Sequence, residues 1–254
     1  MQIVRFTTPD ASELYGVLEG DTIHALNGAP FRGIDYSGVT YLLASVRLLA
    51  PCAPSKIVCL GVNYHGHARE MNHIIPDAPL IFLKPSTAVI GSETGIIYPP
   101  MSQRVDYEAE LAVVIKKAGW RINQKVAWDY VLGYTCFNDV TARDLQKHDG
   151  QWTRAKSFDT FAAIGPWIET ELNPSKLTVE TYLNGERRQH GNTSDLIYPV
   201  DYLIHFISHV MTLLPGDVIA TGTPSGIGPM QPGDTVEVRI EGIGTLRNYV
   251  TRRD

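Results

Sequence analysis

The stretch VDYEAELAVVI, Val105 to Ile115, decides the fold of this sequence. Side chains alternate between the two faces of a strand, so Glu108 and Glu110 share a face with the apolar residues that follow them. Both faces become apolar after the two acids, which predicts a strand buried on both sides. A buried carboxylate is unfavourable unless it is protonated, paired or bound to a cation. The stretch therefore predicts a buried strand with an acidic site at one end.

The composition of the chain is that of an ordinary globular protein. Its 254 residues are 44% hydrophobic and 19% charged, which suits one large β-rich domain with an appendage, or two modest domains. A formal net charge of -5 argues against nucleic acid as a partner. The segment YLLASVRLLA, which contains Arg47, is too short to span a membrane. With no leader-like start and three cysteines without metal-ligand spacing, we expect a cytoplasmic protein with reduced thiols.

The strand pattern divides the chain into two parts. Residues 1–52 form a small N-terminal domain, with a strand at MQIVRF and a hairpin that turns at Gly20. The proline-rich segment LLAPCAPSK is the expected linker. Residues 53–254 carry nine candidate strands: KIVCLGV, PLIFLKP, ELAVVIKK, VLGYTCFND, AIGPWIET, TVETYLNG, DVIATGT, TVEVRI and GTLRNYV. We predict a β-rich α+β fold, arranged as a sandwich or rolled barrel with a small N-terminal β unit.

One long helix is expected near the C-terminal end. It begins near Pro199 and runs through VDYLIHFISHVMTL. The expected apolar face consists of Tyr202, Leu203, Phe206, Ile207, Val210 and Met211. His205 and His209 have the spacing of a helical metal pair, but they fall with Asp201 on the opposite face. The glutamate of the zinc-protease motif is missing, so we expect a solvated face there.

A third acid follows another predicted strand. The segment GYTCFND ends at Asp139, where the apolar pattern breaks. If this strand neighbours the first one, Asp139 can join Glu108 and Glu110 around one cation. Three carboxylates form an oxygen site suited to Mg²⁺ or Mn²⁺, with Ca²⁺ as a further candidate. The alternative is a set of solvated acids at exposed strand ends.

Two further segments carry residues of catalytic type. In GVNYHGHAREM a short helix would place His67 and Glu70 on one face, so that Glu70 holds one imidazole nitrogen and raises the basicity of the other. The alternative is an incidental surface pair. In QWTRAKSFDTF, Lys156 has aromatic neighbours and could offer a cation to an anionic substrate, unless it is a surface lysine. Lys84 has the same ambiguity, and we interpret it as structural.

The glycine-rich segment TGTPSGIGPM does not match a nucleotide-binding motif. It lacks the lysine of the P-loop and the third glycine of the dinucleotide fingerprint. Its Thr223 hydroxyl and backbone amides could still meet an anion.

These motifs together resemble the fumarylacetoacetate hydrolase family. GVNYHGHARE, IFLKPSTAVIG, DYEAELAVVI, GYTCFNDVTARDLQ, RAKSFDTFAAIGPWI, LNGE and MTLLPGDVIATGTPSGIG occur in that family's order. The resemblance covers the catalytic domain from about Lys56 to the C-terminus, and the short N-terminal unit is similar to bacterial and archaeal members. It implies a mixed β-sandwich roll, a homodimer, and one Mg²⁺ or Mn²⁺ in each subunit.

The resemblance also implies roles for individual residues. The metal ligands are Glu108, Glu110 and Asp139, and the general-base pair is His67 and Glu70. Lys156 and Gln146 match the catalytic residues that hold substrate oxygens. Thr223 lies in the loop that receives the substrate carboxylate, and Arg143 is assigned with it to substrate binding.

The implied activity is metal-dependent hydrolysis of the C–C bond in an acylpyruvate or another 2,4-dioxo acid. His67, oriented by Glu70, would deprotonate the attacking water. The same site could instead decarboxylate a 2-oxo dicarboxylate such as oxaloacetate, or isomerise a hydroxyheptadienedioate-type intermediate of aromatic catabolism. We favour the hydrolase. A non-catalytic metal-binding β-fold protein is the remaining alternative.

Overall fold

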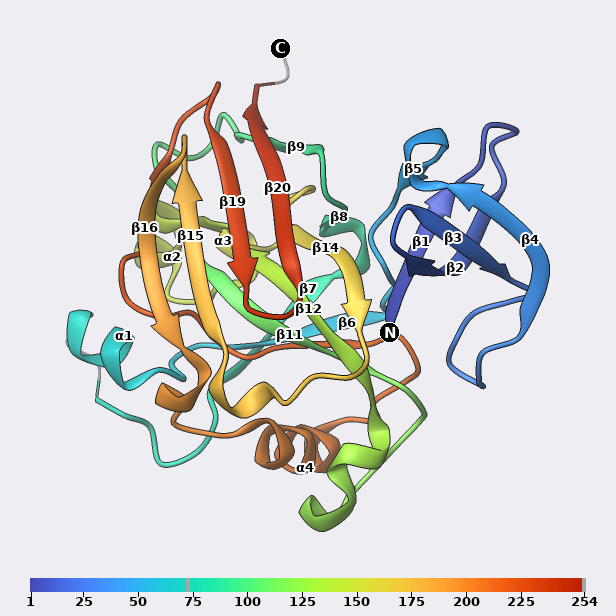
Figure 1. The fold of residues 1–254 in the computed structure, drawn as a ribbon. Helices are drawn as coiled ribbons and strands as arrows, with labels where there is room; N and C mark the ends of the chain where they lie inside the picture. The colour runs from blue at the N-terminus through green and yellow to red at the C-terminus, as the bar shows by residue number, and fades with distance from the viewer. Residues whose placement is uncertain (72–73, 253–254) are drawn as a thin grey trace.

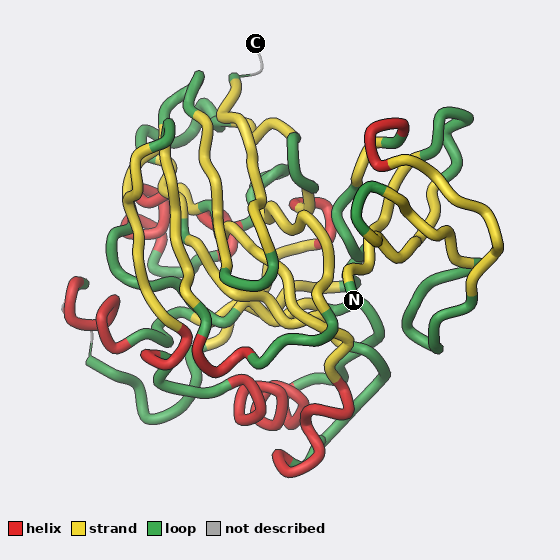
Figure 2. The backbone as a smooth tube through the Cα atoms, viewed as in Figure 1, coloured by secondary structure: helices red, strands yellow, loops and turns green. Residues whose placement is uncertain are grey.

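The computed structural model describes residues 1–71 and 74–252, and strands dominate this part of the chain (Figures 1 and 2). The largest sheet has the order β4-β3-β2-β1-β14-β12-β11-β17-β6-β7, with β5 paired to β1 and β8 paired to β14. Its strands are β1 (Gln2–Thr7), β2 (Glu13–Glu19), β3 (Thr22–Leu26), β4 (Tyr36–Leu42), β5 (Arg47–Leu48), β6 (Lys56–Leu60), β7 (Ile81–Pro85), β8 (Val89–Ile90), β11 (Ala109–Ile115), β12 (Val131–Asp139), β14 (Ala162–Glu169) and β17 (Val218–Ala220).

Two smaller sheets complete the strand framework. The five-stranded sheet consists of β16 (Glu186–Asn192), β15 (Thr178–Leu183), β19 (Thr235–Ile240), β20 (Gly244–Thr251) and β9 (Thr94–Ile97). The three-stranded sheet consists of β13 (Thr141–Ala142), β10 (Val105–Tyr107) and β18 (Gly228–Met230). The α-helices are α1 (His65–Glu70), α2 (Arg143–Asp149), α3 (Thr153–Lys156) and α4 (Val200–Val210). Short 3₁₀ turns are η1 (Leu43–Ser45), η2 (Ser86–Ala88), η3 (Gln124–Tyr130), η4 (Pro174–Lys176) and η5 (Thr193–Asp195).

Strand β11 lies between two hydrophobic cores. Leu111 and Val113 face the core that the large sheet shares with the five-stranded sheet and α4. Ala112 and Val114 face a second core on the other side of the large sheet. Figure 1 shows four strands of the five-stranded sheet, β15, β16, β19 and β20 in orange and red, as a layer across the large sheet. Every residue of β11 is buried, which confirms the predicted burial on both sides. The packing of the two larger sheets confirms the predicted β-rich α+β sandwich roll.

All nine candidate strands form, but the sequence analysis did not predict two strands of seven residues, β4 in the N-terminal unit and β16. Strand β16 has the sequence ERRQHGN, and Gln189 is its only fully buried residue. No alternation of apolar residues marks it, because it lies at the edge of its sheet and pairs only with β15. The strands β13 and β18 were missed because three residues or fewer carry no readable period, and the single strand expected over Val105–Ile115 is divided at Glu108 into β10 and β11.

Helix α4 begins after Pro199 as predicted, but its buried face differs from the expected one. Leu203 and Ile207 are buried, whereas Val210 is 56% exposed. The opposite face is not fully solvated either. His205 is half-buried, and its Nδ1 lies 2.8 Å from the carbonyl oxygen of Ile122, because the segment before η3 packs against this face. His209 is exposed, as expected.

The N-terminal unit continues the large sheet, with the predicted hairpin in place. Strand β1 pairs with β2 on one side and with β14 of the larger part on the other. A separate core of Val4, Phe6, Leu18 and Ile23 lies within this unit, which Figure 1 shows in blue at one side of the molecule. The boundary at residue 52 and the homodimer stay predictions. No helix in the described residues is long and apolar enough to cross a membrane.

Candidate metal centre and active site

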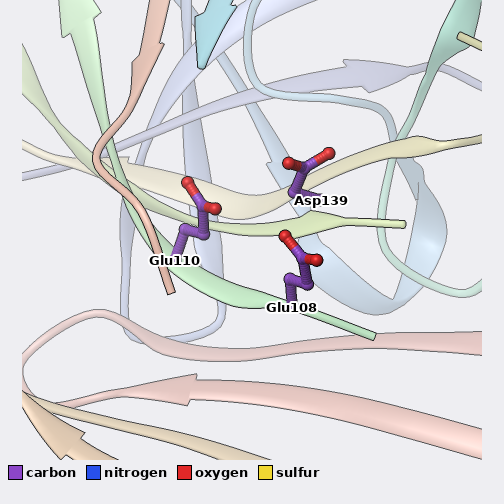
Figure 3. Close-up of side chains that lie close together, drawn as sticks. All are labelled: Glu108, Glu110 and Asp139. Carbon is purple, nitrogen blue, oxygen red and sulfur yellow. The ribbon is translucent and has the colours of Figure 1, made fainter. Parts of the chain in front are cut away.

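Three acids converge where β11 and β12 run side by side. The two strands are antiparallel, with Ala109 opposite Asn138, so Glu108 and Asp139 lie next to each other at the strand ends. The backbone N–H of Asp139 donates to the carbonyl oxygen of Glu108 at 2.9 Å. One oxygen each from Glu108, Glu110 and Asp139 lies within 4.8 Å of the others, and all three side chains are buried (Figure 3). The structure thus brings together the three acids that the sequence pattern singled out.

Two buried lysines and one arginine contact the acids. Lys156 Nζ donates to Oε2 of Glu108 at 2.9 Å and to Oδ2 of Asp139 at 2.6 Å. Lys84 Nζ donates to Oδ1 of Asp139, and Arg143 donates to Oε1 of Glu108. Lys156 is therefore not a surface lysine. Lys84, which we interpreted as structural, is fully buried against an acid of the site. The available signal was a lysine inside the apolar strand IFLKP, where a buried charge needs a partner.

Glu110 differs from the other two acids because one of its oxygens has no partner. Its Oε2 accepts a hydrogen bond from the Gly222 N–H at 2.8 Å, but Oε1 is buried without one in the described residues. Burial, followed by the charges of Asp139 and Glu108, raises the pKa of Glu110 well above its usual range. Burial also opposes ionisation of Glu108, yet Lys156 and Arg143 outweigh it and lower that pKa.

An unpaired buried oxygen that faces two other carboxylates is what a bound cation would satisfy. The donor set consists of oxygens alone, and oxygen donors suit a hard divalent ion. The residues therefore fit the metal that the sequence predicts, with Glu108, Glu110 and Asp139 as its holders.

The His67–Glu70 pair forms on α1. Oε2 of Glu70 lies 3.1 Å from Nδ1 of His67, and the imidazole is buried. Asp195 anchors the start of the helix, since its Oδ2 accepts the Gly66 N–H at 2.9 Å. A cavity of about 420 Å³ is lined by both His67 and Glu108, and its walls also include Arg143, Gln146, Trp152 and Lys156. Gln146 is held there by Arg143, whose Nη1 donates to Oε1 of Gln146 at 2.6 Å.

The glycine-rich segment TGTPSGIG connects the parts of the site. The Gly222 N–H holds Glu110, and the Gly226 N–H donates to Oε1 of Glu70 at 2.9 Å. Both glycines have positive φ, and a Cβ at Gly226 would lie 2.5 Å from the Arg188 carbonyl oxygen. Thr223 lies between them, buried, on the Glu110 side of the site. A role of Thr223 in substrate binding stays a prediction.

A β-roll that carries buried acids beside a histidine–carboxylate pair is typical of a metal-dependent enzyme. The family model described as fumarylacetoacetate (FAA) hydrolase C-terminal matches residues 56–251, and the Rv2993c-like N-terminal model matches residues 1–51. The chain belongs to the FAA hydrolase family, which confirms the resemblance seen in its motifs.

Named relatives differ in the reaction that their names state. The chain is similar to oxaloacetate tautomerase YisK of Bacillus subtilis, at 44% identity over 83% of this chain and 75% of the relative. The crystal structure of 2-hydroxyhepta-2,4-diene-1,7-dioate isomerase from Mycobacterium marinum has a TM-score of 0.93 and 45% identity, over 100% of this chain and 99% of that one. Maleylpyruvate hydrolase from Sphingobium sp. SYK-6, in complex with manganese(II) and pyruvate, has a TM-score of 0.82 and 30% identity over 100% of both chains.

Proposed function

We propose that this protein is a divalent-metal-dependent tautomerase of 2-oxo dicarboxylic acids of the oxaloacetate class. The observation that carries the proposal is the buried imidazole of His67, which contacts Glu70 and lines one cavity with Glu108 and Lys156. Keto–enol tautomerisation needs a group that takes a proton from carbon and returns it to oxygen, beside cations that stabilise the enolate. The relatives named as tautomerase and isomerase, at 44% and 45% identity, support this choice over the hydrolase named above, at 30%.

Glu70 fixes which imidazole nitrogen of His67 accepts a proton from the substrate. A carboxylate only accepts hydrogen bonds, so Nδ1 of His67 carries the proton and Nε2 is the nitrogen that accepts one from the substrate. The second oxygen of Glu70 is held by Gly226, so the pair cannot turn freely. His67 then moves the proton, while Glu70 keeps the ring in place.

The charge of the site favours an anionic substrate. A divalent ion held by the three acids would act as a Lewis acid toward a substrate carbonyl. Without it, the buried acids outnumber the buried cations by one, so a bound divalent ion leaves one net positive charge. The acids in this count are Asp106, Glu108, Glu110 and Asp139, and the cations are Lys84, Arg143 and Lys156. A small 2-oxo acid would bring the compensating charge.

Hydrolysis of an acylpyruvate is the second candidate function. The similarity to maleylpyruvate hydrolase supports it, because that structure shows the same fold with manganese(II) and pyruvate bound. The same His67 would then deprotonate a water molecule instead of a carbon. Lys156 and Gln146 line the same cavity and would stabilise the oxyanion.

The deciding experiment is a substrate panel with the metal-loaded protein. Oxaloacetate, acetylpyruvate and a hydroxyheptadienedioate are followed in the ultraviolet, and the products are identified. We expect faster equilibration of enol and keto oxaloacetate with Mg²⁺ or Mn²⁺, and its loss in EDTA. Preferential cleavage of acetylpyruvate would establish the hydrolase instead. If a metal-loaded protein converts no member of the panel, the proposed function is wrong and the non-catalytic alternative stands.

A further inference from the structure

Gln189 is a buried polar residue on an otherwise exposed, charged strand. It is 1% exposed, in the middle of β16, and its side-chain amide makes four hydrogen bonds. Its Oε1 accepts from the Ala109 N–H at 3.0 Å and from the Thr181 hydroxyl at 2.6 Å. Its Nε2 donates to Thr223 Oγ1 and to the Pro224 carbonyl oxygen, both at 2.8 Å. One side chain therefore ties the strand between Glu108 and Glu110 to the glycine-rich loop.

The orientation of this amide follows from its partners. The Ala109 N–H can only donate, so it must face Oε1 of Gln189. The Pro224 carbonyl can only accept, so it must face Nε2. An amide flipped by 180° would set its NH2 group against the Ala109 N–H, donor against donor. It would also set its oxygen against the Pro224 carbonyl oxygen, acceptor against acceptor. Thr223 therefore meets an N–H donor, and its hydroxyl oxygen acts as the acceptor in that bond.

This arrangement leaves the Thr223 proton available. A threonine hydroxyl has one proton to donate and accepts through its lone pairs, one of which Gln189 occupies. Within residues 1–71 and 74–252 no acceptor takes the Thr223 proton. Thr223 is buried beside Gly222, whose N–H binds Glu110. The loop thus offers a fixed hydrogen-bond donor next to the acidic site.

We propose that Gln189 is a positioning residue that sets the Thr223 hydroxyl as a donor for a substrate carboxylate. This inference rests on the proposed function, because it assumes that a 2-oxo acid binds beside Glu110. A carboxylate only accepts hydrogen bonds, and bonds to an ionised group are roughly twice as strong as neutral ones. Gln189 therefore contributes to the preference of the site for a free acid over a neutral analogue.

Gln189→Glu is the informative variant. It keeps the size of the side chain and the two bonds that Oε1 accepts, but the new carboxylate has no proton to donate. The Thr223 hydroxyl then turns to donate to residue 189 and is lost to the substrate. Thr181→Val is the matched control, since it removes one of the four bonds without touching Thr223.

The test measures binding of pyruvate and of pyruvamide, its neutral analogue, to Mn²⁺-loaded protein by calorimetry. We expect wild type to prefer pyruvate, and Gln189→Glu to weaken pyruvate binding about tenfold or more while pyruvamide binding changes less than about threefold. Thr223→Val should reproduce this loss, and Thr181→Val should not. Because Gln189→Glu also adds a negative charge that repels an anion, the uncharged variant Gln189→Met must show a smaller loss in the same direction, and it replaces Gln189→Glu if that variant fails to fold.

Two outcomes overturn the inference. If Gln189→Glu changes the affinities for pyruvate and pyruvamide equally, or changes neither, then Gln189 only stabilises the fold. A wild-type protein that binds Mn²⁺ but not pyruvate would overturn this inference together with the proposed function. A wild-type protein that binds pyruvate, shows the selectivity loss in Gln189→Glu, and yet converts no oxo acid would overturn the proposed function alone.

Discussion

The backbone N–H of Gly226 donates to Oε1 of Glu70 at 2.9 Å, while Oε2 of the same carboxylate lies 3.1 Å from Nδ1 of His67. The loop that holds the His67–Glu70 pair is also the loop whose Gly222 N–H holds Glu110. Residues that lie more than 100 positions apart in sequence are therefore fixed to each other by one short backbone segment. A disturbance of this loop should affect proton transfer before it affects the fold.

Gly226→Ala tests that link. A Cβ at this position lies 2.5 Å from the Arg188 carbonyl oxygen, and the φ of +96° is unfavourable for alanine. We expect kcat to fall by about 10²-fold, because small displacements of catalytic groups are costly to rate. Gly233→Ala is the control, since its φ is +98° and its Cβ meets nothing within 4 Å. It should carry the backbone strain, about 1 kcal/mol, without the loss of activity. Equal kcat values in the two variants would contradict a role for the loop in catalysis.

Glu110→Gln should separate the stability of the metal-free protein from metal binding. Among the residues that the structure describes, Glu110 Oε1 is buried without a hydrogen-bond partner beside two other acids, so a neutral amide relieves both repulsion and desolvation. We expect the metal-free variant to unfold about 2–6 °C higher than wild type, for a gain of about 1–2 kcal/mol. Added Mn²⁺ should raise the melting temperature of wild type but not of the variant. If Mn²⁺ stabilises both equally, Glu110 does not hold the ion.

His67→Ala should distinguish the reactions that the site can perform. Tautomerisation and hydrolysis both need a base, so each should slow by about 10²–10⁴-fold. Decarboxylation of oxaloacetate depends mainly on the electron-withdrawing metal and should slow less. Glu70→Gln serves as a comparison, because it keeps the shape of the partner but not its charge. Equal losses in all three reactions would mean that His67 has a shared role, such as shaping the cavity.

The three thiols should be unreactive in the folded protein. Burial raises the pKa of Cys52 and of Cys136 to about 12, and that of Cys59 well above its usual value. Since only the thiolate reacts, labelling at pH 8 should be slow and should accelerate as the pH rises. A chromogenic disulfide reagent should modify three thiols per chain only after denaturation. Rapid labelling of any thiol at pH 8 in the folded state would show that the segment around it opens.

The sequence predicts those parts of this molecule whose signal is local. The strand from Ala109 to Ile115 and the two acids at its start, Glu108 and Glu110, can be read directly, because burial on both faces leaves a continuous apolar run after them. The three acids meet because β11 and β12 are neighbours, and an antiparallel pair close in sequence is a common arrangement.

The rest depends on contacts between distant segments. Lys84 contacts Asp139 only because β7 joins the sheet through β6, and nothing near Lys84 in sequence indicates an acid. Gln189 lies on a charged edge strand without a periodic pattern, so its burial follows from the loop at Thr223 that packs over it. The buried face of α4 shifted for the same reason, since η3 packs against the side expected to be solvated.

Lys156→Met tests the role proposed for Lys156 in stabilising negative charge on the substrate, and Lys84→Met is its matched comparison. Each lysine is buried and contacts a different oxygen of Asp139, so removing either ammonium leaves one buried carboxylate oxygen without its partner. Loss of one member of a buried ion pair typically costs about 3–5 kcal/mol, and the metal-free form of both variants should be less stable by that order. Bound Mn²⁺ should recover part of the loss in each, because it supplies positive charge to the same acids.

The two variants should differ in kinetics. Lys156 lines the cavity that contains His67, whereas Lys84 Nζ is directed to Asp139 and the Val140 carbonyl oxygen. If Lys156 stabilises charge that develops only in the transition state, its loss lowers kcat with little change in KM. If it only grips a substrate carboxylate, KM rises and kcat holds. We expect the first pattern for Lys156→Met, and a kcat for metal-loaded Lys84→Met within about threefold of wild type. Steady-state kinetics with oxaloacetate decides this, and matching kcat losses in both variants would remove the distinction between the two lysines.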